Sequence, residues 1–240
     1  MSQRNLFPKI IQGKLEAQIC YFIFHFPVNL LVSDVGYDTV YEKAVSGAGD
    51  EKELLKMPGG VGPTSWSRDG RFLLFNTANA ARTGAAMGVL PLEGDRKPVL
   101  LPGTGFDGSF SPDGRWVAYD STESGRSEVY VRPFLAATPS LGEGKWQVSK
   151  DGGGGPRWRQ DGKEIIFFSS TNYMAAEVNG TGATFQMGTP RPLFVTNRFT
   201  TGVDVSADGQ RFLMTVPPGQ GAAPQTPITV VLNWQADLRK

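Results

Sequence analysis

The sequence is poor in the residues from which most metal centres and many catalytic sites are built. Its 240 residues include one cysteine and one histidine. The single cysteine, Cys20, cannot form an intrachain disulfide. The single histidine, His25, excludes metal sites and catalytic groups that need two imidazoles. We therefore expect no metal and no other cofactor.

Neither sign of charge is in excess, and long apolar runs are missing. The 24 basic and 23 acidic residues leave a net charge of +1, so composition favours neither nucleic acid nor an anionic membrane as a partner. The apolar stretch 19–32 is shorter than the ~20 residues of a spanning helix and is interrupted by Pro27 and Asn29. It is also not followed by the small-residue cleavage site of an export signal. We expect no membrane insertion, and a strand-like or poorly defined N-terminal segment at residues 1–36.

The motifs of common enzyme classes are missing as well. The nucleophile motif G-x-S-x-G does not occur, and His25, the one histidine base, lies in an apolar run. Neither glycine-rich stretch, 57–62 or 151–155, leads into the Lys-Ser/Thr step of a phosphate-binding loop. The sequence therefore predicts a protein that is not an enzyme.

A repeated phrase dominates what the sequence does contain. The four copies are WSRDGRFLLF, FSPDGRWVAY, WRQDGKEIIF and VSADGQRFLM, and each places an Asp-Gly step before an apolar stretch. Their aspartates follow one another at intervals of 44, 48 and 47 residues. The predicted turns are Asp69-Gly70, Asp113-Gly114, Asp161-Gly162 and Asp208-Gly209. A period in the forties with several strands in each unit is typical of a β-propeller blade.

The Asp-Gly step has a structural explanation. Aspartate accepts a hydrogen bond from the backbone two residues on, and glycine adopts positive φ, so the chain reverses between two strands. We interpret these aspartates as turn residues and not as calcium ligands, because calcium loops need several oxygen donors at fixed spacing. Three further strands follow the turn in the second repeat.

The predicted fold is all-β, a propeller of four-stranded antiparallel blades. The blades are expected around residues 58–101, 102–149, 150–195 and 196–240, with a partial blade at 37–57 that lacks an Asp-Gly turn. Two arrangements remain open. The repeats either close as a five-bladed ring, with an N-terminal strand completing the last blade, or form an open arc cut from a larger ring. An open arc would expose sheet faces and favour self-association or a partner.

The repeats resemble the TolB-type, WD-repeat-like β-propeller family, whose blades carry a Trp-Ser-Pro-Asp-Gly-Arg/Lys turn. The phrases FSPDGRWVAYDSTESGRSEVYVRPF, GKWQVSKDGGGGPRWRQDGKEIIFF and TPITVVLNWQADLRK also resemble the C-terminal propeller region of bacterial membrane-anchored serine/threonine protein kinases. That resemblance covers residues 37–240 and implies a periplasmic or otherwise extracytoplasmic sensor region. The sequence has none of the kinase motifs, so no kinase residue is carried over. A chain made alone, without a clear signal peptide, would stay in the cytoplasm.

Two function classes follow from the sequence. The first is a non-catalytic binding or sensor module for a protein, a peptide or an envelope glycan. The second is a structural fragment of a longer kinase without a function of its own; the non-catalytic propeller of a peptidase is a remote third. Binding propellers commonly use the face that carries the loops between blades. The residues expected there are Thr104, Asp107, Glu123, Arg126, Asp151, Arg157 and Arg198.

Overall fold

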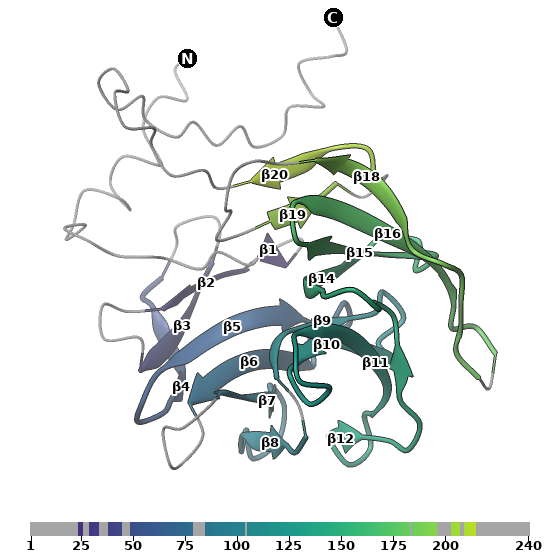
Figure 1. Cartoon of the computed structure of the whole chain (residues 1–240). Coiled ribbons are helices and arrows are strands. Elements are labelled where there is room, and N and C mark those ends of the chain that lie inside the picture. Colours follow the sequence, from purple (N-terminus) through teal and green to yellow (C-terminus); the bar gives the residue numbers. More distant parts are fainter. Residues whose placement is uncertain are drawn as a thin grey trace, which may run out of the picture.

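The structure is a computed structural model that describes residues 24–25, 29–33, 38–44, 49–78, 85–103, 105–182, 184–195, 203–206 and 209–214. All regular elements in these ranges are β-strands, and they form five separate sheets (Figure 1). The same ranges contain no helix that is long and apolar enough to cross a membrane.

The strands of each sheet follow one another along the chain. Sheet 1 consists of β1 (Phe24–His25), β2 (Asn29–Ser33), β3 (Thr39–Ala44) and β4 (Lys52–Lys56). Sheet 2 consists of β5 (Val61–Trp66), β6 (Phe72–Ala78), β7 (Ala85–Pro91) and β8 (Val99–Leu101). Sheet 3 consists of β9 (Phe106–Phe110), β10 (Trp116–Ser121), β11 (Glu128–Leu135), β12 (Ser140–Leu141) and β13 (Trp146–Gln147).

Sheet 4 repeats the plan of sheet 3. It consists of β14 (Gly154–Trp158), β15 (Glu164–Ser169), β16 (Asn172–Asn179), β17 (Gln186–Met187) and β18 (Arg191–Val195). Sheet 5 is described for β19 (Val203–Val205) and β20 (Phe212–Met214). In sheets 3 and 4 the fourth strand is divided into two short pieces that both pair with the third strand. All pairings are antiparallel, so the predicted all-β fold with four-stranded blades is confirmed.

The N-terminal strands complete the first sheet. The sequence predicted a partial blade at 37–57 and left open whether an N-terminal strand completes the last blade. In the structure, β2 pairs with β3 over five residue pairs, and β1 pairs with β2. Sheet 1 therefore crosses the boundary expected after residue 36. Its first hairpin has no Asp-Gly step, which is why the repeat pattern does not reveal it.

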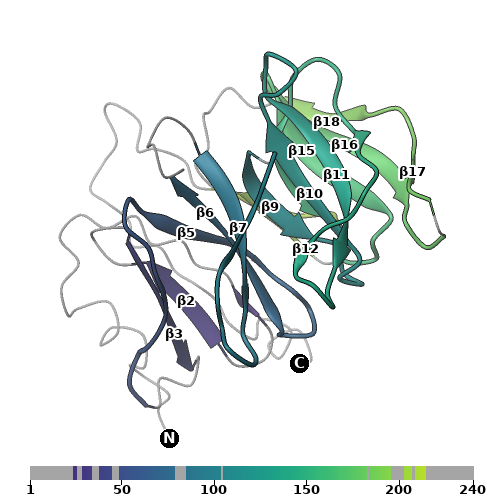
Figure 2. The ribbon, with the colours of Figure 1, turned by 90° about the horizontal axis from the view of Figure 1, so that it is seen from below.

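The sheets follow one another around a common centre, with the first strand of each sheet innermost (Figure 1). Figure 2 shows sheets 1 to 4 side by side in chain order. The inner strands are joined directly to one another. The Phe110 amide of β9 donates to Ser65 Oγ of β5 at 3.1 Å, and Trp158 Nε1 of β14 donates to the Ser109 carbonyl at 3.1 Å. These bonds fix the spacing of neighbouring sheets close to the axis.

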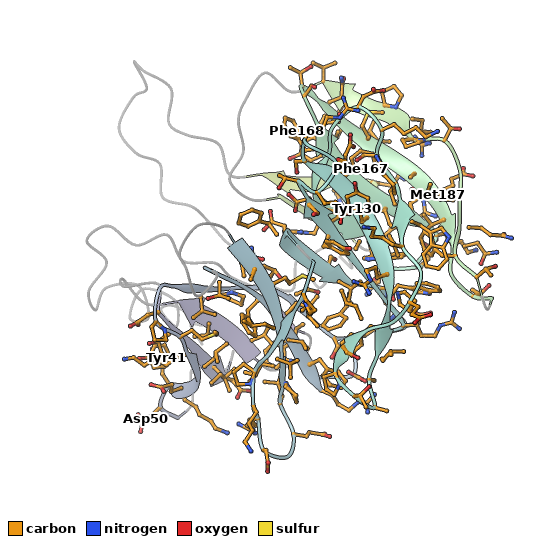
Figure 3. The ribbon with its side chains drawn as sticks, turned by 60° about the horizontal axis from the view of Figure 1, so that its bottom comes forward. Tyr41, Asp50, Tyr130, Phe167, Phe168 and Met187 are labelled. Carbon is orange, nitrogen blue, oxygen red and sulfur yellow. The ribbon has the colours of Figure 1, made fainter. Side chains whose placement is uncertain are left out.

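The hydrophobic core is divided into layers that lie between consecutive sheets. Leu73 and Phe75 of β6 pack against sheet 1, while Phe72 and Leu74 of the same strand pack against sheet 3. Phe167 is buried between sheets 3 and 4, and Figure 3 shows it in the interior, whereas Met187 lies at the rim. Both faces of sheet 2 are thus covered by neighbouring sheets. Burial of one such side chain contributes about 1.5–3 kcal/mol.

Candidate binding face

The Asp-Gly turns lie on one face of the propeller, which we call the turn face. They join β5 to β6, β9 to β10 and β14 to β15, and a fourth hairpin joins β19 to β20. Gly70, Gly114, Gly162 and Gly209 have φ between 70° and 78°. Asp69, Asp113 and Asp161 occupy equivalent hairpins, while Asp208 lies outside the described residues.

The aspartate carboxylates of these turns are paired within each turn. Asp69 Oδ1 accepts hydrogen bonds from Ser67 Oγ at 2.6 Å and from the Arg71 amide at 3.1 Å. Asp113 repeats both bonds with Ser111 and Arg115 at the same distances. Burial would raise the pKa of Asp69, but the hydrogen bonds from Ser67 and Arg71 outweigh it and lower the pKa. The carboxylates are therefore used to build the turns.

The opposite face, which we call the connection face, carries the loops between the second and third strands and the connections from one sheet to the next. Loop 122–127 joins β10 to β11, and connection 148–153 joins sheet 3 to sheet 4. Of the residues predicted for this face, Glu123, Arg126 and Asp151 lie in these two segments, and Asp107 is the second residue of β9. Arg157 lies inside β14, directly before Trp158 and next to the turn face, so its expected place in a loop is wrong. Thr104 and Arg198 lie outside the described residues.

Arg126 is bound by its own protein. Its Nε donates to Glu128 Oε1 at 2.6 Å, its Nη2 donates to the Lys150 carbonyl and lies 3.7 Å from Asp151 Oδ1. The Glu128 side chain is 1% exposed and also accepts from Ser149 Oγ and from the Gly152 amide, the latter at 3.0 Å. The guanidinium that the sequence offered as a ligand contact therefore holds loop 122–127 against connection 148–153.

Glu123 is also paired. Lys145 Nζ lies 2.5 Å from Glu123 Oε1, with both side chains partly exposed. The same ammonium lies 5.0 Å from the centre of the Tyr130 ring. Among the described residues, the predicted contacts Asp107, Glu123 and Arg126 thus belong to separate side-chain clusters.

Asn76 and Asp107 join sheets 2 and 3 near the axis. Asn76 Nδ2 donates to Asp107 Oδ1 at 3.2 Å, and the Asp107 amide donates to Asn76 Oδ1 at 3.1 Å. Asp107 has φ 51°, in the left-handed region that non-glycine residues seldom occupy. Phe106, which precedes it, is a large apolar side chain that is 44% exposed. Backbone strain such as that of Asp107 is concentrated at functional sites.

Asp120 holds the corresponding position between sheets 3 and 4. It follows Asp113 by the same seven positions by which Asn76 follows Asp69. Ser127 Oγ lies 3.1 Å from Asp120 Oδ2, and a side chain at Gly154 would put its Cβ 3.3 Å from the same oxygen. Within the described part of the chain, Asp120 Oδ1 is buried without a hydrogen-bond partner.

The surroundings of Asp120 favour its neutral form. Burial and then the nearby Asp107 carboxylate raise the pKa of Asp120 to about 7, although the Ser127 hydroxyl and the Gly155 amide act in the opposite direction. A carboxyl group that changes charge near neutral pH thus lies between two sheets at the connection face.

Sequence reasoning missed Phe106, Asn76, Asp120 and Ser127. One signal was available for Asp120, because it is the single charged residue of the apolar strand WVAYDS. No signal marked Ser127, since its role depends on a chain segment that is distant in sequence. Among the described residues, no group of three or more His, Cys, Asp or Glu side chains is placed to hold a metal ion.

Solved structures with the same fold include several propeller proteins. TolB from Acinetobacter baumannii is similar with a TM-score of 0.61 and 18% identity, over 84% of this chain and 50% of TolB. Hydrazine synthase from Kuenenia stuttgartiensis has a TM-score of 0.50 and 15% identity, over 79% of this chain and 58% of that chain. A candidate 6-phosphogluconolactonase from Bacteroides uniformis has a TM-score of 0.50 and 14% identity, over 81% and 62%.

The chain therefore spans about half the length of TolB and less than two thirds of the other two proteins. At these identities the likeness shows the fold, which is that of a TolB-like β-propeller. The sequence matches no protein-family model and no curated protein.

Proposed function

We propose that this chain is a non-catalytic binding module that engages a protein, a peptide or an envelope glycan through its connection face. The observation that carries the proposal is the contrast between the two faces. On the turn face, the turn aspartates are consumed by repeated hydrogen bonds. On the connection face, Asp107 is strained and Asp120 Oδ1 is unpartnered among the described residues. A left-handed φ at a non-glycine residue beside a buried carboxyl oxygen without a partner supports a functional role for this position.

The chemistry of this face favours a ligand that supplies hydrogen-bond donors. Asp107 provides a half-buried carboxylate near the axis, and Phe106, directly before it in β9, adds an exposed aromatic side chain. Hydroxyl groups of a glycan, or an ammonium or guanidinium group of a peptide, would complement carboxylates and pack on such a ring.

The resemblance of the repeat phrases to kinase-linked propellers supports a sensor role outside the cytoplasm for this module. The competing proposal is a fragment of a longer kinase that binds nothing by itself. The reading frame upstream of this chain separates them in part, because a kinase domain and a membrane helix encoded there would support the kinase-linked origin. Binding by the isolated chain then separates a module from an inert fragment.

The decisive experiment measures binding to glycan and peptide arrays, followed by calorimetric titration of each ligand found. Phe106→Ala and Glu123→Gln alter the connection face, and Lys97→Ala is the matched control on the turn face, where Lys97 is exposed in the β7–β8 loop. We expect Phe106→Ala to weaken binding by about tenfold or more, the loss typical of a contact worth at least 1.4 kcal/mol. Lys97→Ala should bind like the wild type.

Three results would overturn the proposal. Loss of binding in Lys97→Ala with retention in Phe106→Ala would assign the ligand to the turn face. The absence of any ligand would favour the inert fragment. Turnover of ATP, an ester or a peptide by the purified chain would show that the protein is an enzyme.

A further inference from the structure

Ser127 has one hydroxyl proton and two acceptors within hydrogen-bond distance. Its Oγ lies 3.1 Å from Asp120 Oδ2 and 3.0 Å from the carbonyl oxygen of Gly153. A serine hydroxyl donates one hydrogen bond and accepts others. The acceptor that receives the Ser127 proton therefore depends on whether Asp120 can itself act as a donor.

The two protonation states of Asp120 give different networks. A protonated Asp120 donates its O–H to Ser127 Oγ, and Ser127 then donates to the Gly153 carbonyl. An ionised Asp120 is an acceptor alone, and its charge makes it the stronger acceptor for the Ser127 proton. The Gly153 carbonyl then loses that donor, and the backbone bond from the Gly153 amide to the Ser127 carbonyl, at 2.9 Å, remains.

We propose that Asp120 and Ser127 form a proton-controlled latch, which fastens connection 148–153 to loop 122–127 when Asp120 is protonated and loosens it when Asp120 is ionised. Ionisation releases the carboxyl proton to solvent and exchanges one hydrogen bond for another. Both segments belong to the connection face, so an effect of the latch on a ligand rests on the proposed function. The effect of the latch on the two segments themselves does not depend on the proposed function.

The groups around Asp120 set the latch to act near neutral pH. These groups come from β9, from the loop before β11 and from β14. β9 provides the Asp107 carboxylate, which together with burial raises the pKa of Asp120 to about 7. The Ser127 hydroxyl, which precedes β11, and the Gly155 amide of β14 lower that pKa.

The neighbouring contacts limit how far the latch can move. The Gly152 amide is held by Glu128 Oε1 at 3.0 Å, independently of Asp120. Loosening should therefore be greatest from Gly153 to Gly155. The same position between sheets 2 and 3 carries Asn76, whose side chain has no titratable proton, so that junction serves as an internal reference.

The test is amide hydrogen exchange of the wild-type chain at about pH 5.5 and about pH 8.5, corrected for intrinsic exchange rates and with the signal of residues 150–156 resolved. We expect protection of this segment to fall by about tenfold or more at the higher pH, since one pKa unit corresponds to a tenfold change in equilibrium. Protection of the Asn76–Asp107 junction should not change. Equal protection of residues 150–156 at both pH values would overturn the proposal.

Four variants separate the latch from a general effect of pH. Asp120→Asn should stay fastened at both pH values, because the asparagine amide donates to Ser127 as the protonated acid does. Ser127→Ala should be loosened at both. Asp107→Asn keeps an acceptor for Asn76 and tolerates positive φ, and it should shift the midpoint to lower pH by removing a like charge. Asp95→Asn, on the turn face and 82% exposed, should behave like the wild type.

A Ser127→Ala chain that keeps the wild-type pH dependence, or an Asp120→Asn chain that is loosened at both pH values, would also overturn the proposal. Circular dichroism of each variant shows whether it is folded. Carbon-13 NMR of the Asp120 carboxyl group in the wild type provides the midpoint without any substitution. Because no ligand takes part, failure of this test is distinct from failure of the proposed function.

Discussion

Asp107 and Gly155 occupy the same place at the start of consecutive sheets and share one backbone conformation, with φ of 51° and 59°. The Asp107 amide donates to Asn76 of the preceding sheet at 3.1 Å, and the Gly155 amide lowers the pKa of Asp120 in the preceding sheet. Each also lies at a register shift of its inner strand. The difference is that the Asp107 carboxylate accepts a hydrogen bond from the Asn76 side chain, whereas Gly155 has no side chain that could accept one.

The first prediction tests this equivalence with the double variant Asp120→Asn/Gly155→Asp. It should rebuild the Asn76–Asp107 pair between sheets 3 and 4, because a Cβ at Gly155 meets no atom within 4 Å and aspartate tolerates positive φ. Gly155→Asp alone should destabilise the chain by placing a second carboxylate beside Asp120. We expect a favourable coupling energy of about 1 kcal/mol in a double-mutant cycle from denaturant unfolding. Additive effects would contradict the equivalence.

The second prediction concerns the turn glycines. Gly114→Ala should lower the free energy of unfolding by about 1–2 kcal/mol, because φ at this position is 70°. No atom lies within 4 Å of the added Cβ, so backbone strain is the cause. Gly62→Ala in β5 is the matched control, since its Cβ is equally free and its φ is not positive. Thermal melts that place both variants at the same midpoint would show that the turn does not require glycine.

The third prediction concerns the buried carboxylate of Glu128. Glu128→Gln should destabilise the chain by about 1.5–3 kcal/mol, the loss expected when a buried charge-assisted bond is removed. Glu123→Gln, in the neighbouring loop, breaks an exposed pair and should cost about 0–1 kcal/mol. Chemical denaturation at neutral pH measures both, and equal losses would contradict the role given to Glu128.

The pH dependence of Glu128 has the opposite sign to that of Asp120. Burial would raise the pKa of Glu128, but hydrogen bonds from Ser149, Gly152 and Arg126 lower it below the ordinary value of 4.5. A depressed carboxyl pKa contributes stability that is present above the unfolded pKa and is lost as the pH falls through the folded pKa. The Glu128→Gln penalty should therefore shrink in acid, below the ordinary glutamate pKa.

The fourth prediction follows from the raised pKa of Asp120. In the folded chain this pKa is about 7, against 3.8 in the unfolded chain. The folded state then binds the proton more tightly, so the Asp120 contribution to stability is complete below the unfolded pKa and declines as the pH rises through 7. Asp120→Asn should gain stability relative to the wild type over this interval. A difference in the free energy of unfolding between the two proteins that stays constant from pH 3.8 to about pH 7 would contradict this prediction.

The repeats made most of the fold predictable from the sequence. Each Asp-Gly step fixes a hairpin locally, and the residues Ser111, Asp113 and Gly114 build their turn without help from distant segments. Sheet 1 escaped because its pairing of β2 with β3 is carried by an N-terminal segment that does not repeat. Hairpins with an Asp-Gly turn could be predicted from the sequence, whereas strand pairing without such a turn could not.

The site was less predictable, because burial and partners decide what a charged residue does. Arg126 looked available in the sequence, but the buried Glu128 and the Lys150 carbonyl occupy its guanidinium. Arg157 looked like a loop residue, but the strand β14 includes it. Asp120 gained its properties from Asp107, Ser127 and Gly155, which three different segments bring together.

The division of the core into layers between sheets determines how the chain can fail. An inner sheet such as sheet 3 contributes side chains to two layers, one shared with sheet 2 and one with sheet 4. Deleting it would strip the partners from both neighbours at once, whereas the described residues of sheet 5 contribute only to the layer shared with sheet 4. Loss of sheet 5 should therefore be tolerated better than loss of sheet 3, because in repeat proteins each unit is stabilised by its direct neighbours.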